Sequence, residues 1–343
     1  MKNYSNKEYY KNCVADPNRQ FDLIETTISH LFRFPHPALQ GLSYGAAFCK
    51  QVLERELLTN DHKVIIEVGG GLGDFAHDFL TQLYKEQVQL PYIVLDISSE
   101  LQKRQKDTLK DFPNVYFHLA DAQQQPFQEQ EIQGLVISNE VIADFDSVEF
   151  SAEEWSSSQD PDIQFLHNVV SVPKEKTLFN VGSINFIKNL YRILAPKSTA
   201  IIIEHGLWED SRVTLTGRPT SPETSHFEFS INWSHIYHLA KNLGFSCEIE
   251  ALIDFLSFDK EVEVANLNDS RALNKVDPNF PIAAIPASLL YQIFEGADIR
   301  SSAGLRLPKV GAEGFPDDNT LPFYQSFQTL ILKKIKLIDV VLV

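Results

Sequence analysis

Short runs of β-branched residues alternate with helical patterns, and this alternation constrains the fold most strongly. Strands are expected over residues 64–68, 92–95, 115–119, 135–138 and 200–204. Helical patterns follow the first two runs at 75–86 and 99–111, and another occupies 184–194. Parallel strands need long crossovers that pack on the sheet faces. The sequence therefore predicts an α/β fold built from βαβ units around a buried, mostly parallel sheet.

The other segments are expected to surround this core. Two helices are predicted within 22–58, a helix over 233–243 that stops at Gly244, a helix from 287 onward and a last strand over 323–332. Between Glu149 and Asn180 the periodicity disappears. We therefore predict an N-terminal helical segment or cap (1–60), a core (61–148 and 181–206), an inserted substrate-facing segment (149–180) and a C-terminal part of core and cap (207–343).

Charge and cysteine content exclude several classes of function. The chain has 30 basic and 46 acidic residues, a net charge of −16, which disfavours nucleic acid and anionic membranes as partners. Three widely spaced cysteines indicate neither a disulfide framework nor a thiolate metal site and favour a cytosolic, cytoplasmic location. No run approaches the roughly 20 uncharged apolar residues of a membrane span.

A glycine turn follows the first strand in the pattern E-x-G-x-G-x-G, with Glu67, Gly69, Gly71 and Gly73. Glycines allow positive φ and close approach of a ligand, and the next helix offers unpaired N–H groups. The dinucleotide fingerprint would need glycine where Asp74 stands. A carboxylate there repels a pyrophosphate and favours a cation, such as the sulfonium and ammonium of S-adenosyl-L-methionine. Alternatively, the glycines form a tight turn that binds no ligand.

Acidic residues end the next two strands. Asp96 is placed to accept hydrogen bonds from two ribose hydroxyls, and Ile97 to pack on an adenine. Asp121, followed by Ala122, is placed to accept the adenine amino group. A cap or turn role is the alternative for Asp96.

The ends of the fourth and fifth strands should border the departing methyl group. Asn139 can hold the cofactor or orient Glu140. A helical turn would put Glu140 and Asp144 on one face, where they can bind a guanidinium or amine and take its proton. Alternatively, Glu140 caps a helix dipole and Asp144 is solvated. His205 is a candidate base or an aromatic wall, and His235 and His238 are interpreted as core or surface residues, so no metal is expected.

The chain resembles a known group at these motifs. The glycine turn with Asp96 looks like that of a seven-stranded, S-adenosylmethionine-dependent methyltransferase over about residues 60–205. The tract SNEVIADF at 138–145 resembles the S-N-E-x-x-D-A motif of the MidA family of mitochondrial complex I assembly methyltransferases and their bacterial relatives. Residues 204–206 are similar to that family's D-Y-G, and 227–233 to its D-I-T-A-H-V-D-F segment. The resemblance implies a Rossmann-like sheet with helices on both faces, and the family includes protein arginine methyltransferases.

Departures from the family pattern weaken any transfer of its substrate. The family's acid three residues after the glutamate is displaced to Asp144, and Glu204-His205 replaces its Asp-Tyr. We therefore expect a methyltransferase (EC 2.1.1.-) acting on a nitrogen, arginine-like, or oxygen acceptor of a peptide, protein or natural product. A non-catalytic assembly factor and, with less support, a nicotinamide-dependent oxidoreductase are the alternatives. A homodimer is left open.

Overall fold

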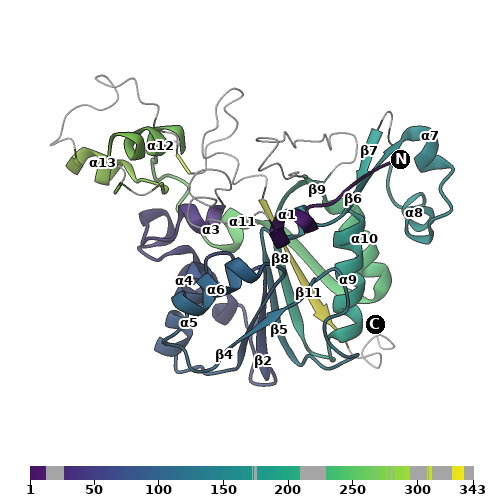
Figure 1. Ribbon diagram of the computed structural model, residues 1–343, viewed down its shortest axis with the longest axis horizontal. Coiled ribbons are helices and arrows are strands. Elements are labelled where there is room, and N and C mark those ends of the chain that lie inside the picture. The colour runs from purple at the N-terminus through teal and green to yellow at the C-terminus, as the bar shows by residue number, and fades with distance from the viewer. Residues whose placement is uncertain are drawn as a thin grey trace.

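The computed structural model describes residues 1–12, 27–171, 173, 176–208, 229–265, 267–277, 279–280, 282–293, 307, 309–310 and 327–335. Its centre is an eight-stranded sheet (Figure 1). The strands follow the order β10 (Phe245–Ala251), β11 (Phe327–Lys334), β8 (Thr199–Leu207), β5 (Gly134–Asn139), β2 (Val64–Val68), β3 (Tyr92–Asp96) and β4 (Val115–Leu119), and β9 (Ile231–Asn232) pairs with β8. Only β11 in this path is antiparallel to its neighbours. The predicted α/β fold with a mostly parallel sheet is confirmed.

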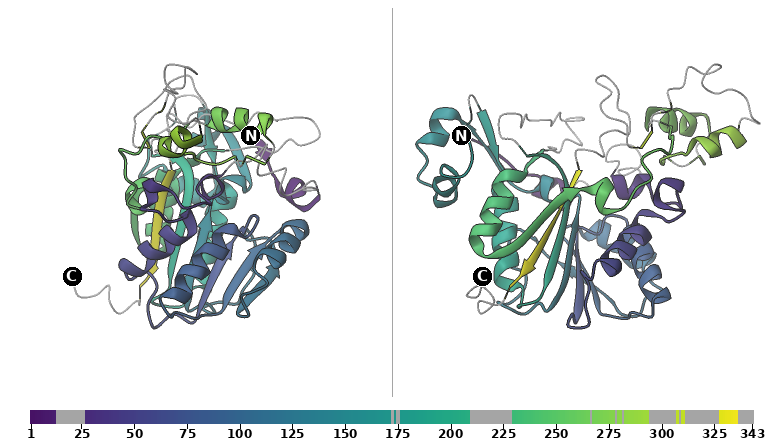
Figure 2. Two further views of the ribbon diagram at one scale, coloured as in Figure 1. Left: turned by 90° about the vertical axis from the view of Figure 1, so that its left-hand side faces the viewer. Right: turned by 180° about the vertical axis from the view of Figure 1, so that it is seen from behind.

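Helices cover both faces of the sheet (Figures 1 and 2). One face carries α4 (Tyr44–Glu54) and α5 (Asp74–Lys85), and the other carries α9 (Val181–Ile193) and α10 (Trp233–Leu243). Successive side chains of a strand point to opposite faces. Accordingly, Ile65 of β2 is buried in the cluster under α4 and α5, whereas Ile66 is buried in the cluster under α9 and α10. Burial on both faces explains the continuous apolar runs of the sequence.

The segment 149–180 is more regular than the sequence suggested. It contains most of β6 (Ser147–Ser151), α7 (Ala152–Ser156), α8 (Pro161–Leu166) and β7 (Lys176–Phe179). These strands join β1 (Lys2–Tyr4) in a separate antiparallel sheet of order β1-β6-β7. Because the partner of β6 comes from the first residues of the chain, no local pattern identified this sheet.

The remaining helices are shorter than α4, α5, α9 and α10. They are α1 (Lys7–Asn12), α3 (Ile28–Leu31), η1 (Pro37–Leu39), α6 (Ser99–Thr108), η2 (Ile142–Asp144), α11 (Leu252–Phe255), α12 (Leu267–Val276) and α13 (Ala287–Ile293). The segment 22–26 at the start of the first expected helix, the start of the last strand at 323–326, residues 227–228 and the tail from 336 lie outside the described residues. Among the helices described, none has the length and apolar character to cross a bilayer.

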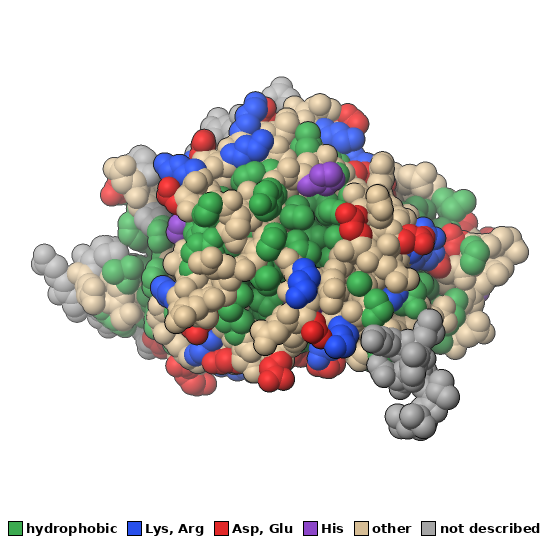
Figure 3. Space-filling view, turned by 90° about the horizontal axis from the view of Figure 1, so that it is seen from below, with side chains coloured by type: hydrophobic (Ala, Val, Ile, Leu, Met, Phe, Trp, Pro, Cys, Tyr) green, Lys and Arg blue, Asp and Glu red, His purple; other side chains and the backbone are tan. Residues whose placement is uncertain are grey.

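The two ends of the sheet differ in surface chemistry. Seen from below, toward the amino ends of the parallel strands, the molecule shows hydrophobic side chains bordered by charged groups of both signs (Figure 3). The carboxyl ends of the strands instead open into the cavity that holds the candidate site.

Candidate active site

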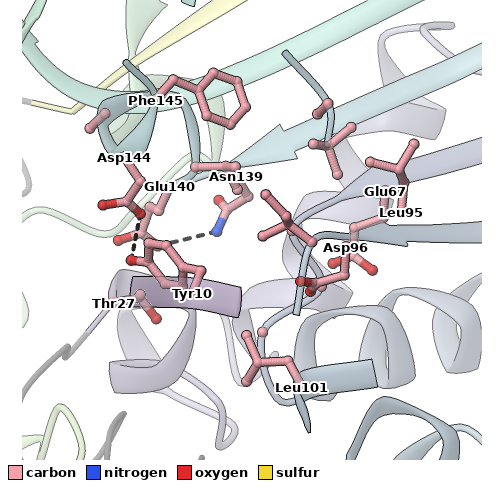
Figure 4. A pocket seen from close by; sticks show the side chains of 18 of the residues that line it. Tyr10, Thr27, Glu67, Leu95, Asp96, Leu101, Asn139, Glu140, Asp144 and Phe145 are labelled. Atoms are coloured by element: carbon pink, nitrogen blue, oxygen red, sulfur yellow. Dashed lines mark hydrogen bonds between the residues drawn. The ribbon is translucent and has the colours of Figure 1, made fainter. Parts of the chain in front are cut away.

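A cavity of about 470 Å³ lies at the carboxyl ends of β2, β3, β5 and β8. Figure 4 shows Asp144, Glu140 and Asn139 on one side of it, and Glu67, Asp96 and Leu101 on the other. The predicted site residues that line it are Glu67, Gly69, Gly71, Asp96, Ile97, Asp121, Ala122, Asn139, Glu140, Asp144 and His205. Gly73 is the one predicted site residue outside the lining. No described residue of 149–180 lines the cavity, so the substrate-facing role of that segment stays a prediction.

The glycine turn needs glycine for two separate reasons. Gly69, Gly71 and Gly73 have φ values of 71°, 50° and 88°, which are left-handed. In addition, a Cβ on Gly69 would lie 2.4 Å from Cγ2 of Val141, and one on Gly70 would lie 2.5 Å from Cγ1 of Val94. Gly73 is the N-cap of α5, which explains its place outside the lining. The turn therefore presents bare backbone to the cavity.

Asp96 is tied to the glycine turn through a residue that the sequence did not single out. Its carboxylate accepts hydrogen bonds from the backbone N of Ser98 at 2.9 Å and from Nε2 of Gln105 at 2.7 Å. The same Gln105 amide lies 3.1 Å from the carbonyl oxygen of Gly71. Burial raises the pKa of Asp96 from 3.8 to about 6, although these hydrogen bonds oppose the rise. Gln105 lies on α6, nine residues after Asp96, so only the fold brings the two together.

Glu67 and Asp121 have contrasting surroundings. Glu67 is 2% exposed and accepts a hydrogen bond from the Tyr92 hydroxyl at 3.1 Å. Burial raises the pKa of Glu67 to about 8. Asp121 instead forms an ion pair with Nζ of Lys7 at 3.2 Å, and the same amine lies 2.9 Å from Asp146. Partial burial alone lowers the pKa of Lys7, but the carboxylates of Asp146 and Asp121 raise it overall.

Glu140 does cap a helix, but one that comes from the N-terminal part of the chain. Its carboxylate accepts hydrogen bonds from the backbone N of Ile28 at 2.9 Å and of Ser29 at 3.3 Å, at the start of α3. Nδ2 of Asn139 lies 3.2 Å from Oε1 of Glu140. Burial raises the pKa of Glu140 to about 7, and the hydrogen bonds from Ile28 and Ser29 oppose this. Glu140 has a left-handed φ of 55° and lies outside η2, so the expected helical turn from Glu140 to Asp144 is wrong.

Asp144 is held by the N-terminal helix rather than left in solvent. Its carboxylate accepts a hydrogen bond from the Tyr10 hydroxyl at 2.8 Å and a longer one from Nδ2 of Asn6 at 3.4 Å. Glu204 lies nearby, 4% exposed, and accepts hydrogen bonds from the backbone N of Ala143 and of His205. Burial, with Glu140 and Asp144 as neighbouring charges, raises the pKa of Glu204 well above its usual value.

The histidines fall into two groups. His205 lines the cavity, with Nδ1 3.2 Å from the Ser230 hydroxyl and its ring 5.6 Å from the ring of Phe327. Its geometry is compatible with both roles considered above. His235 is buried and stacks on Trp155 with ring centroids 5.1 Å apart, as a core residue does. Across the described part of the chain, no cluster of His, Cys, Asp and Glu is suited to a metal ion.

The cavity is strongly acidic. Its described lining carries carboxyl groups from Glu67, Asp74, Asp96, Asp121, Glu140, Asp144 and Glu204. Lys7 is the one lysine or arginine in that same lining. Burial raises the pKa of several of these groups, including Glu67, Glu140 and Glu204. A cationic ligand favours their ionised forms, so the lining suits a ligand with positive charge better than an anionic one.

Comparisons with known proteins agree with this geometry. Residues 47–159 match the model of a family described as S-adenosyl-L-methionine-dependent methyltransferases. A search of curated proteins gives no match. Among solved structures, the chain resembles a methyltransferase-like superfamily member from Burkholderia thailandensis bound to S-adenosylhomocysteine, with 14% identity, 95% of this chain and 87% of that chain covered, and a TM-score of 0.55. Another structure of the same superfamily and organism gives 15% identity, coverage of 92% and 86%, and a TM-score of 0.53.

These findings bear on the class of protein. The likeness to solved structures establishes the methyltransferase fold, and the matched segment contains the glycine turn, Asp96, Asp121 and Asn139. Together they support an S-adenosyl-L-methionine-dependent methyltransferase, as the sequence predicted. The narrower resemblance to the MidA family stays a prediction.

Proposed function

We propose that this chain binds S-adenosyl-L-methionine across the glycine turn and transfers its methyl group to a nitrogen or oxygen acceptor. The ribose hydroxyls are assigned to Asp96, and the adenine to Ile97, Asp121 and Ala122. The acceptor is assigned to the end of the cavity near Asp144 and His205. The observation that carries the proposal is that one cavity joins all of these residues.

The charge of the cavity favours this cofactor over a dinucleotide. S-adenosyl-L-methionine brings a sulfonium and an ammonium, which the carboxyl groups of the lining stabilise. Asp74 stands at the first residue of α5, where a pyrophosphate would otherwise bind the helix N-terminus. Burial raises the pKa of Asp74, and a cation beside it would favour its ionised form. A nicotinamide dinucleotide would meet repulsion at the same place.

Methyl transfer requires the protein mainly to position the two reactants. The cofactor supplies an electrophilic methyl carbon, and a nucleophile in line with its bond to sulfur displaces the sulfide. Asp144 and His205 line this end of the cavity and are placed to contact the acceptor. A carboxylate at this end can accept the proton that a nitrogen or oxygen nucleophile loses.

The acidic acceptor end favours an amine or guanidinium over a carboxylate or phosphate. A guanidinium stays charged at neutral pH and needs acidic partners. An arginine-like nitrogen on a peptide or protein, as in the MidA resemblance, therefore ranks first, and a natural product second. We also propose that the enzyme is cytoplasmic and that residues 1–60 and those from 207 onward build its substrate cap.

Two measurements test the proposal. Calorimetry should detect binding of S-adenosylhomocysteine and none of NAD; the opposite pattern would overturn the cofactor assignment. Labelled S-adenosyl-L-methionine should then transfer its methyl group to a component of a peptide panel. Label found only in a small-molecule extract would exclude the protein acceptor, and cofactor binding without any transfer would favour a non-catalytic assembly factor.

A further inference from the structure

The carboxylate of Glu140 is already occupied by the protein itself. Oε2 accepts the hydrogen bond from the backbone N of Ile28, and Oε1 that from Ser29. The Asn139 amide donates to Oε1 as well, and Oδ1 of Asn139 accepts a hydrogen bond from the Tyr44 hydroxyl at 2.7 Å. Both oxygens of Glu140 therefore point into a network that ends at α3 and α4.

The backbone of Glu140 is arranged to support this direction. Its N–H donates to the carbonyl oxygen of Ile203 at 2.9 Å, which fixes the chain just beyond β5. Its φ of 55° is a conformation that non-glycine residues rarely adopt. Strained backbone persists only where the surroundings determine it, and it concentrates at functional sites. Here the surroundings are β8 on one side and the start of α3 on the other.

The start of α3 forms one wall of the cavity. Thr27, Ser29 and His30 all line it, next to the side that Figure 4 shows occupied by Asp144 and Glu140. Thr27 caps α3 through its hydroxyl, which accepts a hydrogen bond from the backbone N of His30. Glu140 joins this wall to the end of β5 through the hydrogen bonds that it accepts from the backbone N of Ile28 and Ser29.

We infer that Glu140 is a positioning residue that fixes the α3 wall against the methyl-transfer end of the cavity, and not the group that takes the proton of the acceptor. This inference rests on the proposed function and deepens it. The acceptor then meets Asp144 and His205, while Glu140 stays engaged with α3. Glu140 therefore affects how tightly the acceptor is held rather than the chemical step.

Two substitutions at Glu140 separate the effect of side-chain length from the effect of charge. Glu140→Gln keeps the length of the side chain but removes the charge and one acceptor oxygen. Glu140→Asp keeps the charge but withdraws it from α3 by one methylene. Glu153→Gln is the matched control, because Glu153 is exposed on α7 and lies outside the cavity.

Amide hydrogen exchange measures directly how firmly the start of α3 is held. Exchange of the Ile28 and Ser29 amides should accelerate about tenfold or more in both Glu140 variants, with no change in the amides of α4 or in Glu153→Gln. Unchanged exchange at Ile28 and Ser29 would overturn the inference. A rise throughout the protein in Glu140→Gln would indicate general destabilisation, in which case Glu140→Asp decides by the same criterion.

Binding and turnover separate this inference from the proposed function. Wild type and both variants should bind S-adenosylhomocysteine within about threefold of one another; failure of the wild type to bind would sink the proposed function and leave the exchange result standing. With the peptide labelled above, the acceptor KM should rise about tenfold while kcat changes less than about threefold, since uniform binding is lost. A fall in kcat of a hundredfold or more at unchanged KM would identify Glu140 as the base instead.

Discussion

Replacing Asp96 by asparagine should weaken cofactor binding and stabilise the empty protein at the same time. The carboxylate is 4% exposed, and its pKa lies at about 6 instead of 3.8. At 1.36 kcal/mol for each tenfold change, ionised Asp96 costs the empty protein about 3 kcal/mol above pH 6. Asparagine is neutral and avoids most of this cost. It also keeps one oxygen to accept the hydrogen bond from Ser98.

The same change removes one hydrogen-bond acceptor for the ribose hydroxyls. A hydrogen bond to a charged group contributes about 1.5–3 kcal/mol, so the Kd for S-adenosylhomocysteine should rise about 10- to 100-fold. Calorimetry at pH 7.5 gives the Kd, and thermal unfolding without ligand should show a Tm unchanged or raised by a few degrees. Asp107→Asn, an exposed position on α6, is the control. A Kd within threefold of wild type would refute the ribose assignment, and a lowered Tm would refute the argument from burial.

Three further outcomes follow from the site. Alanine at Gly70 should abolish measurable binding of S-adenosylhomocysteine and lower the unfolding free energy by about 1–3 kcal/mol, because its Cβ would lie 2.5 Å from Val94; normal calorimetry would contradict this. Burial raises the pKa of Glu67 to about 8, so the folded state holds a proton that the unfolded state releases near 4.5. Urea unfolding of the empty protein should therefore show stability falling from pH 5 to pH 8, and falling less steeply in Glu67→Gln. A rise in stability over that window would be inconsistent with the burial. Lys7→Met should tighten S-adenosyl-L-methionine binding up to about fivefold at low salt, because the amine no longer competes for Asp121. Weaker binding by the variant in a salt titration would exclude this competition.

The sheet was predictable from the sequence because its information is local. Each parallel strand buried on both faces reads as an apolar run, and each crossover helix follows its strand directly, so β2, β3, β4 and β5 were located to within one or two residues. The cofactor half of the site follows from the same logic, since strand ends meet at one edge of a sheet. The strand β10 (Phe245–Ala251) was missed because its mixed polar sequence FSCEIEA borders the sheet edge and is mostly half-buried.

The acceptor half of the site depended on contacts that no local pattern contains. Lys7 and Tyr10 reach Asp121 and Asp144 from more than 100 residues away, and β1 is held by β6 of the inserted segment. The alternative considered for Glu140 was a cap on the helix expected to follow it in the chain. The cap instead serves α3, 111 and 112 residues earlier, because the left-handed backbone after β5 turns the chain away from helix.

That long-range cap has a consequence for how the site is built. The residues proposed to hold the cofactor stand on strand ends and on the glycine turn, which the buried core fixes. The acceptor wall stands on short N-terminal elements. Ile28 and Leu31 of α3 are buried in the cluster under α4 and α5. Described polar contacts also join these N-terminal elements to strand ends at Glu140, Asp144 and Asp121. We therefore expect two roles for carboxyl groups of the cavity: Asp96 is proposed to bind the ribose, whereas Glu140 accepts hydrogen bonds from the start of α3. A pattern of acidic residues at strand ends cannot distinguish these roles, because both carboxylates accept hydrogen bonds from the protein. The donors to Asp96 include Ser98 and Gln105, which follow it closely in the chain, whereas those to the Glu140 oxygens include Ile28 and Ser29 of the N-terminal part.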